Sequence, residues 1–105
     1  SAEVAIEQGY PPTTNDPRAA VLVRQIAEVD YLELPASNMG GEDFSYVLEK
    51  VPGAMAFLGV APAGEEAADR APLHNPSMMI DENVLPKGVA LHCAFALNFL
   101  EEGWS

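Results

Sequence analysis

The last predicted helix restricts the fold most, because it begins near Pro86 and is apolar on nearly every side. A helix of this kind packs against neighbours on more than one face. The longest apolar stretch, Val89–Phe99, contains His92 and Asn98 and is shorter than the roughly 20 residues that a membrane-spanning helix needs. We therefore expect a globular chain with other elements around this helix, and no membrane span. Its apolar residues are Val89, Leu91, Cys93, Phe95, Ala96, Leu97, Phe99 and Leu100.

The N-terminal segment is predicted to be a separate strand. Residues Glu3–Gln8 alternate polar and apolar side chains, which is typical of a half-buried strand. Pro11 and Pro12 end it, because proline cannot donate to a sheet and holds the preceding residue in an extended conformation. The stiff connector that follows is the clearest domain boundary in the chain.

Two further helices are predicted after this boundary. Asp16 and Pro17 form a typical start for an amphipathic helix, and a shorter helix begins near Glu42 or Asp43. The apolar positions of the first are Ala19, Leu22, Val23, Ile26 and Val29, and those of the second are Phe44, Val47, Leu48 and Val51.

Two strands are predicted between these helices and the last one. Tyr31–Leu34 is a short strand candidate, and the unbroken apolar run Ala54–Val60 is typical of a buried central strand. The alternation of helices and strands predicts an α/β sandwich. The strand before Pro11 is expected to belong to a different sheet.

Charge excludes some partners. Sixteen acidic and five basic residues give a formal net charge of −11, which repels phosphate backbones and anionic lipid headgroups. No nucleic-acid or membrane partner is expected. The single cysteine, Cys93, cannot form an internal disulfide, so a reducing compartment, the cytoplasm, is the expected location. The chain starts at Ser1 without an initiator methionine, and we expect it to be part of a longer protein.

Three segments in order carry a resemblance. They are YPPTTND at Tyr10–Asp16, MGGEDFS at Met39–Ser45 followed by VPGA from Val51, and LHNP at Leu73–Pro76 followed by LPKG from Leu85. GGEDFS joined to HNP is far more specific than either motif alone. Over essentially its whole length, the chain resembles the closing third of bacterial hippurate hydrolases, N-acyl-amino-acid amidohydrolases and plant auxin-conjugate hydrolases.

This resemblance implies a two-domain enzyme with an α/β/α catalytic domain and an inserted αβ lid domain that usually mediates dimerisation. Residues 1–10 would then be the last strand of the lid, residues 11–15 the hinge, and residues 16–105 the C-terminal part of the catalytic domain. A homo-oligomer is expected.

The resemblance also implies hydrolysis of the amide bond of N-acyl-amino acids, with hippurate-like substrates. Two divalent metal ions, from zinc, manganese, cobalt or nickel, are held by histidines, carboxylates and a cysteine, and a glutamate acts as general base for the bridging water. Most of these residues precede the segment that this chain matches. The chain alone is therefore expected to be inactive, with no catalytic residue assigned in it and possibly no metal bound.

His74 matches the last metal ligand of the family. It lies between Leu73 and the pair Asn75-Pro76, where a proline-stiffened loop would hold an imidazole in one orientation. Without the resemblance, an ordinary loop histidine would be the better interpretation, since a metal site normally needs about three or four protein ligands.

Four residues are candidates for the substrate pocket. Gly40 and Gly41 present backbone N–H groups at a helix start, which can receive a carboxylate, although capping of the helix by Glu42 or Asp43 explains the same pattern. Asn75 and Asn15 are the other two candidates; a share in capping the Asp16 helix is the simpler role of Asn15.

Two other groups are weaker candidates for metal binding. His92 and Cys93 are adjacent in the last helix and point about 100° apart, and Cys93 shares a face with apolar residues, so a buried, inert thiol is expected. The acidic residues Glu65, Glu66 and Asp69 are interpreted as a solvated loop.

These observations leave three hypotheses. The first is part of a metal-dependent amidohydrolase. The alternative is a non-catalytic module, derived from such an enzyme, that associates with itself or a partner through its uncovered apolar faces. The third is a small metal-binding protein using His74, His92 and the acidic residues; helical geometry argues against His92 and Cys93 acting together in such a site.

Overall fold

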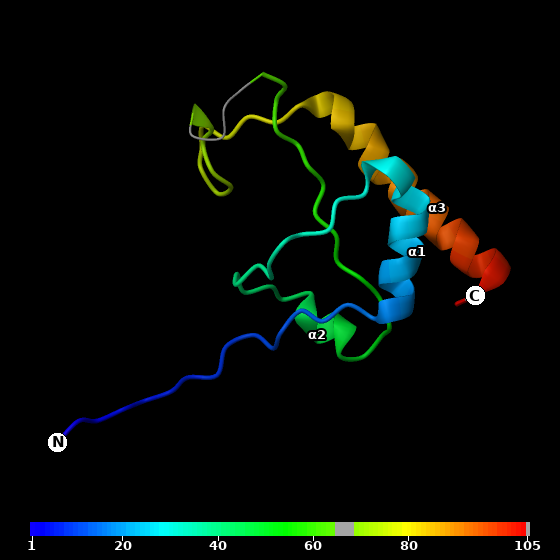
Figure 1. The fold of residues 1–105 in the computed structure, drawn as a ribbon. Coiled ribbons are helices and arrows are strands. Elements are labelled where there is room, and N and C mark those ends of the chain that lie inside the picture. Colours follow the sequence, from blue (N-terminus) through cyan, green and yellow to red (C-terminus); the bar gives the residue numbers. More distant parts are fainter. Residues whose placement is uncertain (65–68, 105) are drawn as a thin grey trace. The chain divides into compact units, whose positions relative to one another are not determined.

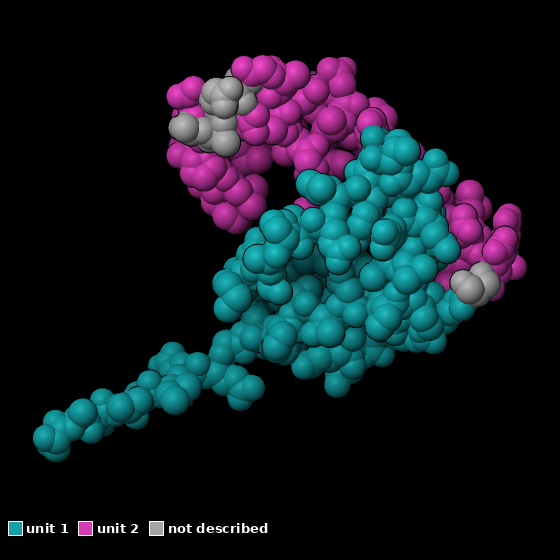
Figure 2. Space-filling model, viewed as in Figure 1, with its two compact units in different colours: residues 1–56, 104–105 teal, residues 57–103 magenta. Residues whose placement is uncertain are grey.

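A computed structural model describes residues 1–64 and 69–104 of the chain. These residues form two compact units, shown in Figure 2. Unit 1 contains residues 1–56 together with Trp104, and unit 2 contains residues 57–103. Glu65 and Glu66 of the predicted acidic loop lie outside the described residues. The helices within each unit are labelled in Figure 1.

Helix α1, Pro17–Ala27, forms as the sequence predicts (Figure 1). The Asp16 side chain accepts a hydrogen bond from the Arg18 backbone N–H, and Pro17 occupies the first turn, where no N–H is needed. Ala19 is fully buried, and Leu22, Val23 and Ile26 are partly covered, as expected of one face of an amphipathic helix. A 3₁₀ turn, η1, follows at Glu28–Asp30.

An ion pair reinforces the start of α1. The guanidinium of Arg18 donates from Nε to Oδ1 of Asp16 at 3.0 Å and from Nη2 to Oδ2 at 2.8 Å, in a bidentate arrangement. The same guanidinium lies 5.2 Å from the centre of the Trp104 ring, within the range of a cation–π contact. One arginine thus joins the helix cap to the C-terminal residues of unit 1.

The predicted second helix is shorter than its apolar pattern. Helix α2 covers Ser45–Leu48, a single turn that starts after the turn residues Asp43 and Phe44. Ser45 is fully buried, and its hydroxyl donates to the Glu42 carbonyl at 2.5 Å. Of the four apolar positions, only Leu48 is partly covered, so the face expected to be buried is largely exposed.

Unit 2 is built around the last helix. Asp81 caps the 3₁₀ turn η3, Glu82–Val84, which leads directly into α3, Leu85–Glu102. The Asp81 backbone N–H also donates to the Val60 carbonyl at 2.9 Å, which joins the apolar run to the start of η3. The helix ends at Gly103, whose φ of +69° favours glycine. The predicted start of this helix near Pro86 is confirmed.

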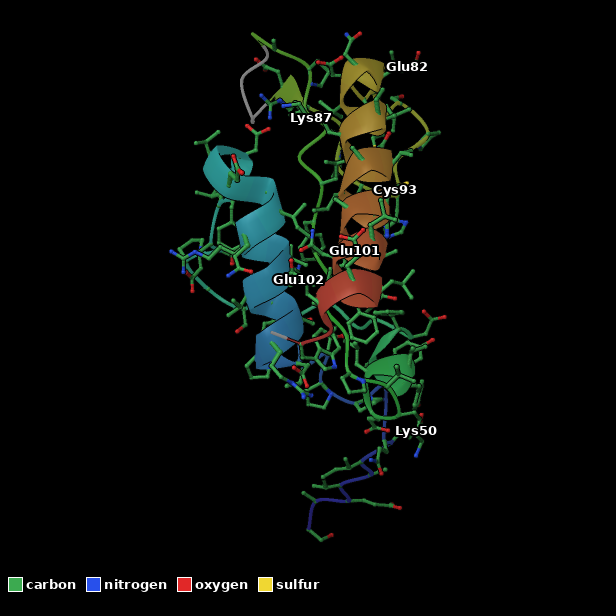
Figure 3. All side chains as sticks on the ribbon, turned by 90° about the vertical axis from the view of Figure 1, so that its right-hand side faces the viewer. Lys50, Glu82, Lys87, Cys93, Glu101 and Glu102 are labelled. Atoms are coloured by element: carbon green, nitrogen blue, oxygen red, sulfur yellow. The ribbon has the colours of Figure 1, made fainter. Side chains whose placement is uncertain are left out.

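Only one stripe of α3 is covered. Gly88, Leu91, Ala94 and Phe95 are partly buried at three- and four-residue spacing, whereas Val89, Leu97 and Leu100 are exposed by 64%, 58% and 79%. The prediction of a buried Cys93 is wrong, because its thiol is exposed on the same uncovered side of the helix. Figure 3 labels it about midway along α3.

The three segments predicted as strands are not paired in the described residues. Residues 3–8, 31–34 and 54–60 carry no strand assignment there, and Val4 and Ile6 are exposed by 80% and 90%. A strand needs a neighbour for its backbone N–H and C=O groups, and the alternation of side chains alone does not supply one. The α/β fold class therefore stays a prediction.

Over the described ranges, no helix is both long enough and apolar enough to cross a bilayer.

Acid should weaken the start of α1 only at very low pH. The hydrogen bond from Arg18 lowers the pKa of the Asp16 carboxyl from 3.8 to about 2. A carboxyl whose pKa is lower in the folded chain stabilises it above the unfolded pKa, and this contribution is lost as pH falls through the folded value. In an NMR titration, the amide signal of Arg18 should shift with a midpoint close to pH 2.

The control for this titration is Asp43→Asn, which should keep the Arg18 transition, whereas Asp16→Asn should abolish it. A midpoint near 3.8 would mean that the Asp16–Arg18 pair does not form in solution.

Candidate functional site

His74 lies on a turn of unit 2 with its side chain exposed. Its φ of +66° places it in the left-handed region, which residues with a Cβ rarely adopt. The next residue, Asn75, closes the turn: its Oδ1 accepts from the Ser77 N–H at 2.8 Å, and its carbonyl accepts from the Met78 N–H at 3.0 Å. A single imidazole is thus presented to solvent on a defined turn.

No complete metal site is present within residues 1–64 and 69–104. Histidine, cysteine, aspartate and glutamate side chains do not gather there in any group of three or more that could hold a metal ion. An exposed imidazole fits the role of one ligand, but a stable site needs about three or four. His74 therefore fits a metal site only as one member of a larger set.

The two glycines of the loop before α2 have local structural roles. The Gly40 N–H donates to the Asn38 side chain at 2.7 Å. A Cβ on Gly41 would lie 3.1 Å from Cδ2 of Tyr10, whose ring packs edge-to-face on Tyr46 with 5.8 Å between ring centres. Gly41 thus admits the Tyr10 ring, and the N–H of Gly40 is already engaged.

Glu42 takes part in the entry to α2. Its Oε1 accepts from the Phe44 N–H at 3.2 Å, and its carbonyl accepts from the Ser45 N–H at the same distance. Phe44, whose N–H donates to the Glu42 side chain, is the residue just before α2, so this bond stabilises the turn that leads into the helix. This supports the structural interpretation of Glu42 that the sequence left open.

The simpler prediction, that Asn15 shares in the capping of α1, is wrong. Its amide pairs with both backbone groups of Met55: the Met55 N–H donates to Oδ1 at 2.9 Å, and Nδ2 donates to the Met55 carbonyl at 3.1 Å. The Asp16 N–H also donates to the Gly53 carbonyl at 2.8 Å. Asn15 therefore joins two segments that are 40 residues apart.

An open hollow of about 550 Å³ lies beside this junction in unit 1. Its walls come from the connector, the start of α1 and the region of α2, and include Thr14, Asn15, Asp16, Ser45, Glu49 and Lys50. Lys50 is labelled in Figure 3. The Asn15 and Asp16 side chains are committed to Met55 and Arg18, so they offer few free groups to a ligand.

The candidates fall into two groups. Asn15, Gly40 and Gly41 belong to unit 1, and His74 and Asn75 belong to unit 2. Sequence reasoning missed the pairing of Asn15 with Met55, for which no local signal exists. It also missed the positive φ of His74, because such a φ is uncommon for any residue with a Cβ and no feature of the sequence singles out this position.

Comparison with known proteins decides the family. The sequence profile of peptidase family M20/M25/M40 matches residues 1–98. The chain belongs to this family. The resemblance seen in the sequence motifs is thereby confirmed at the level of the family.

The chain is similar to curated proteins that are named for different activities. It is 40% identical over 91 residues to a putative glutamate–cysteine ligase 2-3 of Rhodococcus jostii (strain RHA1), which covers 83% of this chain and 11% of that protein. It is 36% identical over 98 residues to IAA-amino acid hydrolase ILR1-like 6 of Arabidopsis thaliana, with 89% and 20% covered. It is 38% identical over 88 residues to N-acetyl-L-cysteine deacetylase of Bacillus subtilis (strain 168), with 82% and 20% covered.

The chain thus spans between 11% and 20% of the length of these three relatives. No solved structure matches it.

Removal of the Asn15 amide should expose the Met55 backbone to solvent exchange. Asn15→Ala removes the acceptor of the Met55 N–H, so hydrogen exchange of that amide, followed by NMR, should accelerate. Asn15→Asp keeps an acceptor oxygen for the Met55 N–H but sets a second acceptor oxygen against the Met55 carbonyl, so its protection should lie between that of the wild type and that of Asn15→Ala. Equal exchange in the wild type and Asn15→Ala would show that the pairing is not formed.

Proposed function

We propose that this chain is one part of a metal-dependent amidohydrolase that cleaves the amide bond of N-acyl-amino acids. The observation that carries the proposal is the match of family M20/M25/M40 to residues 1–98. Relatives named IAA-amino acid hydrolase and N-acetyl-L-cysteine deacetylase align with more than four fifths of the chain, which supports an N-acyl-amino-acid substrate. Hippurate-like compounds belong to the same chemical class.

His74 is the metal ligand that this chain contributes. Its imidazole is exposed and held on a defined turn, as a ligand that meets others from elsewhere must be. A bound divalent ion, from zinc, manganese, cobalt or nickel, would polarise the scissile carbonyl and activate water at neutral pH. The described residues gather no group of three ligands, so the rest of the enzyme supplies the others.

Asn15, Gly40, Gly41 and Asn75 remain candidates for the substrate pocket. The contacts of Gly41 with Tyr10 and of Asn15 with Met55 favour a role in shaping the walls of such a pocket over direct contact with the substrate. Exposed Cys93, with no second cysteine in the sequence, supports a cytoplasmic location.

The isolated chain should be inactive. Purified and supplied with zinc, manganese or cobalt, it should release no amino acid from hippurate or from N-acetyl amino acids, because one imidazole cannot hold the metal in a catalytic geometry. In the whole enzyme, His74→Ala should lower kcat/KM by at least about tenfold through loss of metal.

The matched control is His92→Ala, which removes the other histidine from an exposed position on α3 and should leave the activity of the whole enzyme near that of the wild type. Hydrolysis by the isolated chain that survives rigorous removal of contaminating enzymes would overturn the proposal of a partial site. Full activity in His74→Ala would remove the ligand role.

A second candidate function is that of a self-associating module. The observation that favours it is the uncovered apolar side of α3, where Val89, Leu97 and Leu100 are exposed together. A second copy of the chain that buried these side chains would remove them from water, at about 25 cal/mol for each Å² of apolar surface. The expected homo-oligomer would then form through this helix.

Self-association should depend on the uncovered side of α3. In sedimentation equilibrium, the isolated chain should form dimers as its concentration rises, and Leu97→Lys should shift it to monomer because a charge would be buried in the interface. Leu73→Lys, at an exposed apolar residue outside the helix, serves as control and should dimerise as the wild type does. A monomer at every concentration would exclude this function.

A further inference from the structure

The uncovered side of α3 is apolar over most of its length. Val89, Leu97 and Leu100 are exposed by 64%, 58% and 79%, and Cys93 is exposed among them. A helix turns by about 100° per residue, so these three side chains leave the helix within about 40° of the direction of Cys93. They form one continuous face, which lies opposite the stripe that unit 2 covers.

The residues of this face are arranged symmetrically about Cys93, which is close to the middle of the helix. Exposed Ala90 and Ala96 lie three residues away on either side, and Val89 and Leu97 lie four residues away. A two-fold axis between two antiparallel copies of a helix places each residue against the one at the same distance on the other side of the axis. With the axis at Cys93, apolar residues would meet apolar residues at each of these positions. The face is therefore complementary to itself in the antiparallel direction.

The charges at the two ends of α3 oppose the helix dipole. Lys87 lies in the first turn and Glu101 in the last, on either side of Cys93 along the helix (Figure 3). The start of a helix carries a partial positive charge and its end a partial negative charge, so a lysine at the start and a glutamate at the end are both placed unfavourably. The stability of the helix itself therefore does not explain these two positions.

An antiparallel second copy brings an opposite charge to each end. Lys87 is six residues before Cys93 and Glu101 is eight residues after it, so across the axis they differ in height by only about 3 Å. They also lie on the same flank of the helix, about 120° and 80° around from Cys93. Rotation about the two-fold axis keeps each flank on its own side. The contact would thus have a Lys87–Glu101 pair at each end of its rim, whereas a parallel contact would place the two lysines at the same end.

We propose that a second copy of this chain docks antiparallel on the uncovered side of α3, with the two-fold axis at Cys93 and an ion pair between Lys87 and Glu101 at each end. This inference rests on the self-associating function proposed above and adds the direction and the centre of the contact.

Reversal of the two charges tests the direction. In sedimentation equilibrium with reductant, Lys87→Glu and Glu101→Lys should each weaken dimerisation about three- to tenfold, because two repulsive contacts replace two ion pairs. The variant with both substitutions should return to within about twofold of the wild type. The two positions are about 21 Å apart along one helix, so they can compensate for each other only between copies.

Glu102 provides the matched control. It is next to Glu101 but points about 180° from Cys93, away from the proposed contact. Glu102→Lys combined with Lys87→Glu should therefore not restore dimerisation. Circular dichroism should show that Lys87→Glu keeps its helix, since an acidic residue in the first turn favours the helix dipole. Weaker dimerisation in that variant then reflects the contact and not unfolding.

Disulfide trapping tests the centre of the contact. Two Cys93 thiols that react with oxidised glutathione form one S–S bond, and their protons and two electrons leave with two molecules of reduced glutathione. The bond needs the two Cα atoms within about 7 Å, which only residues near the axis satisfy. In Val89→Cys with Cys93→Ser, the two thiols would be about 12 Å apart along the helices, so the wild type should be trapped at least about tenfold faster.

A mixture of two variants distinguishes the antiparallel from the parallel contact. Val89→Cys and Leu97→Cys, each combined with Cys93→Ser, should together form a mixed disulfide about as fast as the wild type forms its own, because residue 89 of one copy lies opposite residue 97 of the other. In a parallel contact, Val89→Cys would instead be trapped with itself as fast as the wild type.

The outcomes separate this inference from self-association as such. Rapid trapping of Val89→Cys with itself, or a double charge reversal that stays as weak as the single variants, would overturn the antiparallel contact and leave self-association intact. A chain that remains monomeric with reductant at every concentration would overturn both, and would indicate that the rest of the enzyme covers this side of α3.

Discussion

Unit 1 depends on a junction of two adjacent polar residues. Asn15 supplies one donor and one acceptor to Met55, as a neighbouring strand would, and the Asp16 N–H donates to the Gly53 carbonyl. The Asp16 side chain also caps α1 and binds Arg18. Ala19 and Ser45 are the only fully buried residues in the described ranges. Polar contacts, more than a buried apolar core, therefore hold the segments of unit 1 together. Loss of these hydrogen bonds should therefore disorder unit 1.

The sequence predicted features that depend on neighbours along the chain. The cap of α1 at Asp16 and the start of α3 near Pro86 follow from residue types at fixed offsets, and both are present. The run Ala54–Val60 shows where such prediction stops. Its composition is typical of a strand, but a strand also needs a neighbouring strand to pair with, and the local pattern does not identify one. Family membership was recognisable from the GGEDFS and HNP motifs, whereas the pairing of Asn15 with Met55 joins positions too distant for any local rule.

His74 and Asn75 show how a motif and its geometry differ. The motif identified the histidine through resemblance, and the structure adds that its backbone has a φ of +66°, which is uncommon for residues with a Cβ. Because Asn75 bonds Ser77, a polar residue first considered for substrate contact has a backbone role as well. Gly41 is similar, since the space left by its missing side chain is taken by Tyr10. In both cases the residue acts on the shape of the loop, which residue type alone does not reveal.

The exposed thiol of Cys93 has a practical consequence for any study of this chain in air. It is the only cysteine in the sequence and lies on the uncovered side of α3, so it is accessible to the thiol of a second molecule. Aerobic oxidation would join two copies by a covalent bond, and the product would have the mass of a dimer whatever the affinity of the helices for each other. Dimers found without reductant can therefore arise from a disulfide between two copies. Dimers found with reductant arise from contact between the apolar surfaces.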